Sequence, residues 1–364
     1  MNYTRPWTRQ GTECFPRPCA GPHPFNNQVT AMKKILNDPM NYVQEMLEGL
    51  CAAHPQYYQR TGEEGRVIVR PGAPVKGKVG IVTGGGSGHL PVFTGYVGRG
   101  LLDACAIGEV FASPGVDLMA TAIRAAEGGA GVLRLYGNYS GDVMNFDMAG
   151  ELVEMEGIRT TTVRVADDVA SAGPEERDKR RGVAGMVYCF KIAGAMADRM
   201  AGLEEVTAVA QKAADACRSV GVALTPCVVP AAGKPTFTLG EDEMEMGMGI
   251  HGEPGVSRGP LRRADEIAEE MLQMIRKDMP LGAGDRVSVL CNSLGATPLE
   301  ELYIVYRYVA RRLKQWGVDI VMPLVGRYAT SMEMAGMSLT LCKLDPQLEE
   351  LLLAPCDCPF LKVG

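Results

Sequence analysis

The chain carries a histidine in a setting where its ring could react with a small molecule. His251 lies in residues 247–255, where glycines on both sides leave the backbone bare and let a ligand approach the imidazole. Imidazole is well suited to nucleophilic attack and proton transfer near neutral pH. Taken alone, the segment more often indicates a turn histidine in a glycine- and proline-rich loop. Its interpretation therefore depends on the motifs upstream.

A second histidine, His89, closes a glycine-rich loop at residues 83–91, directly after a predicted strand. Such a loop offers unpaired backbone N–H groups in a concave turn, which suits hydroxyl or phosphate oxygens. A P-loop would need a lysine that is missing here, and a dinucleotide fingerprint would need a small residue where His89 stands. We therefore expect His89 at the carboxyl end of a strand, facing a ligand crevice.

An aspartate, Asp142, lies within residues 138–146 and follows a glycine at the predicted start of a helix. Viewed alone it favours a helix N-cap, because aspartate is among the preferred capping residues. Viewed together, His89, Asp142 and His251 each follow a strand or a glycine turn. Residues gathered in one cleft show this pattern, so we expect the three side chains to lie together.

Strand-like runs alternate with helical patterns on both sides of these motifs. Ser113 and Pro114 predict the N-cap and first turn of a helix over 116–126. Thr297 opens a capping box before a helix whose Leu302, Val305 and Leu313, with Val309, share one face. Residues 181–217 are rich in helical patterns. The predicted strands are residues 78–83, 131–136, 160–165, 220–224, 286–291, 319–323 and 338–343.

This alternation predicts βαβ units and an α/β fold. We predict two α/β domains with largely parallel sheets and the active site in the cleft between them. Residues 1–31 show no helical or strand period and are expected to form a flexible tail or an extension. Residues 32–215 are the expected N-terminal domain, with the glycine loop and Asp142, and residues 216–364 the C-terminal domain, with His251.

Composition excludes several classes of function. The net charge of −6 and the lack of a basic cluster argue against a nucleic-acid partner. No apolar run is long enough to cross a bilayer, so a membrane role is not expected. The eleven cysteines are scattered and no secretory signal is present, which favours a reduced cytoplasmic setting. Their spacing predicts no metal site.

Five longer motifs carry a resemblance to a known family: GGGSGH, NYSGDVMNF, VPAAGKPTFTL, GMGIHGEPG and NSLGATPLEELY. With these, the chain from Met32 onward resembles the dihydroxyacetone kinase family, and more narrowly its K subunit. The resemblance implies that His251 attacks the ketone of a short sugar through its outer ring nitrogen and holds it as a covalent hemiaminal. Such a site selects a small carbonyl compound and rejects glycerol, which has no carbonyl to attack.

The resemblance also implies roles for the other motif residues. His89 corresponds to the family's acid/base histidine. Asp142 corresponds to the aspartate bonded to the hydroxyl that becomes phosphorylated, where a carboxylate can orient that hydroxyl and accept its proton. The catalytic set is thus His251, His89 and Asp142. The expected substrate-binding set is Gly86, Ser87, Gly88, His89, Ser113, Gly137, Asp142 and His251.

Two positions depart from the family pattern. Leu90 stands where the family commonly has a glutamate. Gly137 stands where many members carry a substrate-binding lysine, so an ammonium donor is lost and the volume of its stem is expected to be vacated. We therefore consider a larger ketose, such as the four-carbon erythrulose, as an alternative substrate.

Kinases of this family need a helical nucleotide-bearing domain, and the sequence has no cluster of aspartates that could hold its metal ions. The resemblance therefore implies a glycerone kinase of glycerol metabolism whose phosphate comes from a separate L-type subunit carrying ADP or ATP and Mg²⁺. Two phosphoryl donors are left open for that subunit. Either a phosphotransferase-system protein recharges its bound ADP, or the L-type subunit exchanges ADP for ATP. A homodimer is expected. A further alternative is a non-catalytic ketose sensor that acts on a transcriptional regulator.

Overall fold

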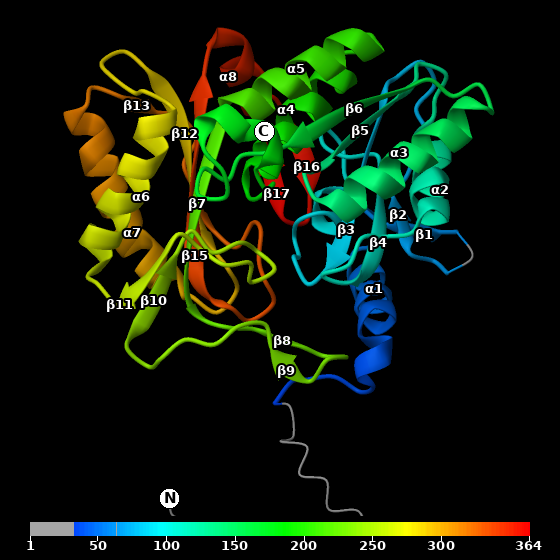
Figure 1. The fold of residues 1–364 in the computed structure, drawn as a ribbon. Helices are drawn as coiled ribbons and strands as arrows, with labels where there is room; N and C mark the ends of the chain where they lie inside the picture. Colours follow the sequence, from blue (N-terminus) through cyan, green and yellow to red (C-terminus); the bar gives the residue numbers. More distant parts are fainter. Residues whose placement is uncertain (1–32, 63) are drawn as a thin grey trace, which may run out of the picture. The chain divides into compact units, whose positions relative to one another are not determined.

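The computed structural model describes residues 33–62 and 64–364, and residues 36–364 form one compact unit (Figure 1). The predicted tail at residues 1–31 lies outside the described residues. The α-helices are α1 (Tyr42–Ala53), α2 (Val116–Ala126), α3 (Ser140–Glu154), α4 (Gly185–Asp198), α5 (Leu203–Ala216), α6 (Ala264–Asp278), α7 (Leu299–Gln315) and α8 (Pro346–Leu353). Three short 3-10 helices are η1 (Pro39–Asn41), η2 (Thr94–Tyr96) and η3 (Pro174–Lys179).

The first sheet has the strand order β1-β2-β4-β3-β5-β6. Its strands are β1 (Gln59–Thr61), β2 (Val67–Val69), β3 (Gly80–Ser87), β4 (Ala104–Val110), β5 (Val132–Gly137) and β6 (Thr160–Val165). Strands β4, β3, β5 and β6 are parallel, and β2 joins β4 antiparallel. The parallel arrangement predicted for this part of the chain is confirmed, because helices α2 and α3 connect its strands as crossovers.

The second sheet has the order β11-β10-β7-β15-β12-β13, with β14 also paired to β12. Its strands are β7 (Cys217–Thr225), β10 (Glu243–Met246), β11 (Ser257–Pro260), β12 (Arg286–Ser293), β13 (Asp319–Ile320), β14 (Leu324–Gly326) and β15 (Ala335–Leu344). Two small hairpins stand apart from it: β8 (Val228–Val229) with β9 (Lys234–Pro235), and β16 (Cys356–Cys358) with β17 (Leu361–Val363).

The prediction of a largely parallel sheet is wrong for this second sheet. Only β13 and β14 run parallel to a neighbour, β12, and the helix α7 connects them to it. The other pairings are antiparallel. The physical reason is the connection: β10 and β15 are reached through segments without an α-helix, and a strand that returns without such a crossover runs opposite to its neighbour. The α/β class itself is confirmed.

Alternating side chains divide the core into three layers. In β5, Leu133 and Leu135 face a central core shared with α4 and α5, whereas Val132 and Tyr136 face α2 and α3. The second sheet divides likewise, with α6 and α7 on its outer face. Figure 1 shows α4 and α5 between the two sheets. Successive side chains of a strand point to opposite faces of its sheet. Because both faces of each sheet are covered, the strands have continuous apolar sequences.

Helix α4 forms the centre of the shared core and is buried on almost every side. A helix that is apolar all round belongs in a protein interior. Its one cationic side chain, Lys191, is buried and donates from Nζ to the Leu351 carbonyl at 2.7 Å. Among the described residues, neither α4 nor any other helix has both the length and the apolar character needed to span a bilayer.

The two predicted helix caps are wrong, although the helices are in place. Helix α2 begins after Gly115 and α7 after Pro298, and neither has a side-chain cap. Thr297 instead donates from Oγ1 to the Gly336 carbonyl at 2.7 Å, because a buried hydroxyl is better satisfied across the sheet than by its own helix. The predicted apolar face of α7 is buried as expected.

Candidate active site

The glycine-rich run forms the end of strand β3 and not a loop. Gly84, Gly85 and Gly86 pair in register with β4. A Cβ atom at Gly85 would lie 2.2 Å from the Phe93 ring, and one at Gly86 would lie 2.6 Å from the Ala112 nitrogen. Only glycine therefore lets the strand pass so close to its neighbours. The backbone groups expected to bind oxygens are partly used in the sheet.

Gly88 then turns the chain and delivers His89 to the interior. Its φ of +100° lies in the region that favours glycine, and a Cβ there would be 2.8 Å from the Phe111 ring. The His89 side chain is only 1% exposed, and its Nδ1 is 2.7 Å from the Thr330 carbonyl oxygen. A carbonyl only accepts, so Nδ1 carries the hydrogen and the Nε2 lone pair is free. Within the described residues, His89 Nε2 has no partner.

His89 is held in its neutral form. Burial, together with the neighbouring His251, lowers the pKa of His89 to about 3, although the hydrogen bond to Thr330 and the Glu253 carboxylate oppose the shift. Charging a ring in an apolar, enclosed position costs free energy that the single carbonyl does not offset. At neutral pH the ring is therefore a hydrogen-bond acceptor through Nε2.

His251 lies in the turn between β10 and β11 and is held by a carboxylate two residues further on. Its Nδ1 is 2.8 Å from Glu253 Oε1, and its main-chain nitrogen donates to Glu253 Oε2 at 2.9 Å. Burial by itself would raise the pKa of Glu253, but the contacts with His251 lower it to about 2. Since the carboxylate accepts from Nδ1, the neutral His251 ring presents an unprotonated Nε2.

The two histidines meet, although one follows the first sheet and the other belongs to the second. Their ring centroids are 4.7 Å apart, with the planes at 81°. Phe111 stacks on His89 at 4.8 Å, and the Tyr139 ring stands edge-on to His251 at 4.7 Å. Phe111 and Tyr139 thus restrict the orientation of the two imidazole rings. The structure brings together the two histidines that the sequence singled out.

Asp142 belongs to the first turn of α3 and is not its cap. The N-cap position is Tyr139, and Asp142 is 7% exposed with no partner for its Oδ1 among the described residues. Burial raises the pKa of Asp142 to about 6, while the Ser113 hydroxyl and the His251 ring oppose this shift. The His251 ring therefore favours the ionised form of the Asp142 carboxyl group.

Ser113 and Ser87 lie on the segments that flank these groups. Asn145 donates from Nδ2 to Ser113 Oγ at 3.3 Å, which ties the start of α3 to the segment after β4. Ser87 Oγ is buried and, in the described part of the chain, makes no hydrogen bond. Ser87 Oγ thereby joins His89 Nε2 and Asp142 Oδ1 as a buried polar atom without a partner. Buried polar atoms are normally paired, so this group points to a polar ligand.

Gly137 ends β5, and two side chains lie close to it. A Cβ atom there would lie 3.2 Å from Met186 Sδ and 3.4 Å from the Tyr139 ring. Met186 and Tyr139 therefore occupy the region next to Gly137. At the Cβ position itself these two side chains lie at van der Waals contact. The expectation that the absent lysine vacates the volume of its stem stays a prediction.

Four further residues shape the site and were not found by sequence reasoning. Glu253 lies inside a recognised motif, and its spacing of two residues from His251 in a glycine turn was a usable signal. Phe111 adopts a φ of 58°, which is rare for a residue with a side chain. No sequence pattern marks Phe111 or Thr330. Tyr139 lies inside the NYSGDVMNF motif, but its ring contact with His251 arises between distant segments and has no local signal.

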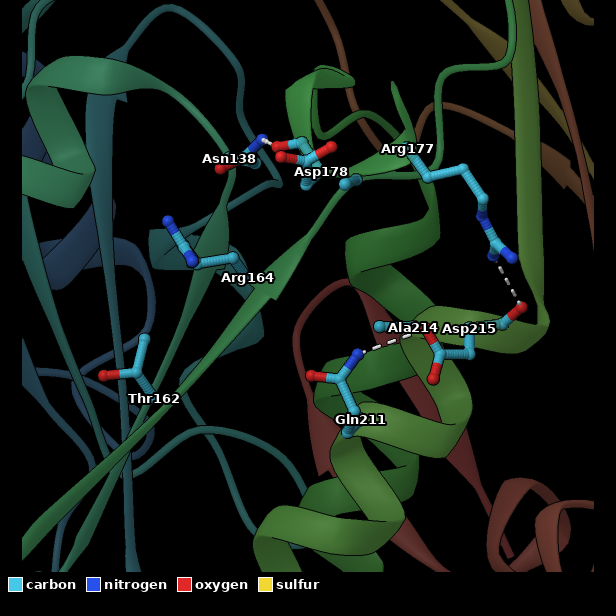
Figure 2. A pocket seen from close by; sticks show the side chains of 9 residues that line it. Asn138, Thr162, Arg164, Arg177, Asp178, Gln211, Ala214 and Asp215 are labelled. Carbon is cyan, nitrogen blue, oxygen red and sulfur yellow. Dashed lines mark hydrogen bonds between the residues drawn. The ribbon is translucent and has the colours of Figure 1, made fainter. Parts of the chain in front are cut away.

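Two cavities border the site. One, of about 650 Å³, lies beside Ser113 and is lined by residues that include Arg66, Glu109 and Gln44. The other, of about 330 Å³, is shown in Figure 2 and contains none of the predicted site residues. Its lining residues are Asn138, Thr162, Arg164, Ala166, Arg177, Asp178, Gln211, Ala214 and Asp215. It approaches the site through Asn138, which donates to the main chain of η3 and of Arg180 at 2.8 Å.

The described residues contain no group of three or more histidine, cysteine, aspartate or glutamate side chains arranged to hold a metal ion. The side chains around the histidine pair are imidazoles, carboxylates and hydroxyls, which can bind, orient and move protons.

The fold and the histidine pair define a recognised class of domain. The Dak1 domain model matches residues 48–360, and the chain belongs to this family, that of the dihydroxyacetone kinases. Within it, the chain is similar to the dihydroxyacetone-binding subunit DhaK of a PTS-dependent dihydroxyacetone kinase of Listeria innocua. The two are 45% identical, and the match covers 91% of this chain and 100% of that subunit. The chain is thus a DhaK-type member of the family.

Two other relatives differ in what their names state. An L-erythrulose kinase of Pectobacterium atrosepticum is 42% identical over 92% of the chain, which spans 57% of that longer protein. The solved structure of a dihydroxyacetone kinase operon co-activator, DhaQ, is 34% identical, with a TM-score of 0.80, covering 86% of this chain and 96% of that one. The family therefore includes kinases of more than one ketose and a regulator.

Proposed function

We propose that the chain is the ketose-binding subunit of a dihydroxyacetone kinase and that it holds its substrate covalently on His251. One observation carries the proposal: Ser87 Oγ, His89 Nε2 and Asp142 Oδ1 are buried in the described structure without hydrogen-bond partners. A short ketose brings several hydroxyl groups and one carbonyl. Its hydroxyls would satisfy these atoms, while its carbonyl carbon would meet the His251 ring.

The attack follows from the hydrogen bond between His251 and Glu253. With Nδ1 donating to the carboxylate, the lone pair of His251 Nε2 is available. It forms a bond to the carbonyl carbon, the π electrons of the carbonyl move to its oxygen, and the oxygen takes a proton. The product is a hemiaminal. Glycerol offers no carbonyl carbon, so this step discriminates ketoses from simple polyols.

Asp142 would then prepare the hydroxyl that receives phosphate. Burial raises the pKa of Asp142 to about 6, so its carboxylate is still largely ionised at neutral pH but is a better base than an exposed aspartate. It accepts a hydrogen bond from the hydroxyl and takes its proton as the phosphoryl group arrives. The neutral His89 accepts from a second hydroxyl through Nε2 and so orients the sugar.

The phosphoryl group comes from a separate subunit in this proposal. The relative in Listeria innocua is named as a binding subunit of a PTS-dependent kinase, which supports division of labour between subunits. The nucleotide and Mg²⁺ would belong to that L-type partner, and ADP recharged by a phosphotransferase protein is the version that this name favours. The functional groups of the present site hold and orient the acceptor and take its proton.

Dihydroxyacetone is the first candidate substrate. Erythrulose is the second, supported by the likeness to an L-erythrulose kinase. A sensor without kinase activity is the third, supported by the likeness to a co-activator. The buried, basic Asp142 argues for the kinase, because a sensor needs to bind a hydroxyl but not to deprotonate it.

Intact-mass spectrometry tests the binding step. The purified chain is mixed with dihydroxyacetone or erythrulose and measured before and after rapid desalting. We expect a mass increase of one ketose that is absent in His251→Ala. Kinase assays with an L-type subunit and its phosphoryl donor test transfer. Adduct formation without any product, with every donor tried, would favour the sensor; absence of an adduct on the unmodified chain would refute the proposal. Equal turnover of the two ketoses would argue against a preference for either.

A further inference from the structure

Glu253 contacts His251 at two points, and this contact has a consequence for the charge of the bound state. Oε1 accepts from the ring Nδ1 at 2.8 Å, and Oε2 accepts from the main-chain nitrogen at 2.9 Å. Both carboxylate oxygens are thereby directed at one residue. The carboxylate is fixed relative to the ring. It therefore faces Nδ1 both before and after Nε2 forms a bond to the carbonyl carbon.

Two forms of the hemiaminal are chemically possible, and they differ by one proton. If the Nδ1 proton is lost as the alkoxide is protonated, the adduct is neutral and the Nδ1 lone pair faces the Glu253 carboxylate. If the ring keeps its Nδ1 proton and the alkoxide takes a proton from the buffer, the adduct is an imidazolium. The first form sets a lone pair against a carboxylate, whereas the second makes a charge-assisted hydrogen bond.

We infer that Glu253 is a positioning residue that keeps the hemiaminal on His251 in its cationic, Nδ1-protonated form, so that ketose binding takes up one proton. The inference rests on the proposed function. The step balances as follows: a neutral ring, a ketone and one proton from a buffer acid give an N-substituted imidazolium that bears a hydroxyl on the attached carbon. No oxidant or reductant takes part.

The other charged or titratable groups around the ring do not supply this effect. His89, at the end of β3, is neutral because its pKa is about 3, and burial raises the pKa of Tyr139 well above its usual value. Arg181 approaches the turn but is paired with Asp168 at 2.8 Å. Among the described residues, Asp142 on α3 is a further acidic group that is electrostatically coupled to His251. The hydrogen bond at the ring Nδ1, however, is to Glu253.

The number of protons taken up is measured by titration calorimetry of the full chain with dihydroxyacetone near pH 8, in buffers that differ in ionisation enthalpy. We expect about one proton per adduct in the natural chain and close to none in Glu253→Gln, whose amide can donate to a bare Nδ1. The affinity of the natural chain should fall by up to about tenfold per pH unit, and that of the variant should not.

A control variant and one direct measurement complete the test. The exposed Glu241→Gln should keep the proton uptake of the natural chain. The ¹⁵N shift of His251 Nδ1 in the adduct of the natural chain should be that of a protonated nitrogen, which needs no variant to fold. Equal uptake in the natural chain and Glu253→Gln, or a bare Nδ1 in the adduct, would overturn the inference. Absence of any adduct on the natural chain would instead refute the proposed function.

Discussion

The rings of His89 and His251 lie edge to face with their centroids 4.7 Å apart, and each uses its Nδ1 to donate to a fixed oxygen. Both therefore present an unprotonated Nε2 when they are neutral. Two lone pairs in one place suit a molecule that offers an electrophilic carbon to one and a hydroxyl hydrogen to the other. An α-hydroxyketone has these groups on adjacent carbons.

Replacing His89 by alanine should weaken dihydroxyacetone binding. The change removes the acceptor for a substrate hydroxyl, and an unpaired buried polar group costs about 1–3 kcal/mol, or roughly 5-fold to 150-fold in Kd. Titration calorimetry provides the measurement. Because the pKa of His89 is about 3, its own titration should leave no step in binding between pH 5 and pH 8. An unchanged Kd in a folded variant would contradict the role assigned to His89.

Replacing Asp142 by asparagine should slow phosphoryl transfer by about 10²- to 10⁴-fold, the usual contribution of a general base. The adduct on His251 should still form. In the natural chain the rate should rise as pH increases through about 6, where the carboxyl group ionises, and then level off. Steady-state assays with an L-type subunit across this pH range, and mass spectrometry of the adduct, are the measurements. Undiminished turnover would remove Asp142 from the mechanism.

The same substitution should stabilise the protein at neutral pH. The folded chain raises the pKa of Asp142 from 3.8 to about 6, so folding is penalised once the group ionises. The penalty is absent below pH 4, grows between pH 4 and pH 6, and reaches about 3 kcal/mol above pH 6. Urea unfolding of Asp142→Asn and the natural chain at pH 4 and pH 8 should show a gain only at pH 8. A gain of equal size at both values would assign it to another cause.

Replacing Gly249 by alanine should disturb Glu253 without unfolding the chain. A Cβ at this position would lie 2.2 Å from Glu253 Oε2 and 2.6 Å from Arg181 Nη1, both at the ends of flexible side chains. We expect weaker adduct formation, with a melting temperature close to that of the natural chain. Gly259, whose Cβ would meet nothing within 4 Å, provides the matched control as Gly259→Ala. Full adduct formation by Gly249→Ala would show that the carboxylate tolerates displacement.

Introducing lysine at Gly137 should not restore a family-like substrate contact. Met186 Sδ and the Tyr139 ring already lie 3.2 and 3.4 Å from the position of a Cβ, so a long side chain must displace one of them. Overpacking of this kind costs about 1–3 kcal/mol. Gly137→Ala should be nearly neutral, whereas Gly137→Lys should lower stability and reduce binding as Tyr139 moves away from His251. Denaturant unfolding and calorimetry of both variants test this; tighter binding by the lysine variant would contradict it.

Much of the fold could be predicted because it depends on local patterns. The strand at residues 160–165 and the helix at residues 116–126 have the predicted bounds, since periodic apolar residues mark them. Strand direction in the second sheet could not be predicted in this way. It depends on the position of β15, which lies between β7 and β12 and runs antiparallel to both. Contacts across the sheet decide that position, and residues within the strand do not.

In the candidate site too, features with a local sequence signal could be predicted, and features that depend on tertiary contacts could not. Glycine turns next to His89 and His251 are local signals, and the structure brings these two rings together. The capping interpretations of Ser113 and Thr297 were wrong, because each hydroxyl finds a partner outside its own helix. The closeness of Met186 to Gly137 could not be predicted, because Met186 belongs to α4 and reaches Gly137 only through tertiary packing.

Helix α4 rests against both sheets, and this has a consequence for how the chain can be divided. Its apolar surface faces the first sheet on one side and the second sheet on the other. A recombinant fragment ending near residue 215 would leave that second surface open to water, and the complementary fragment would lose the helices that cover its inner face. Neither half should be a useful reagent by itself. Split-protein or domain-exchange designs should therefore keep residues 36–364 together.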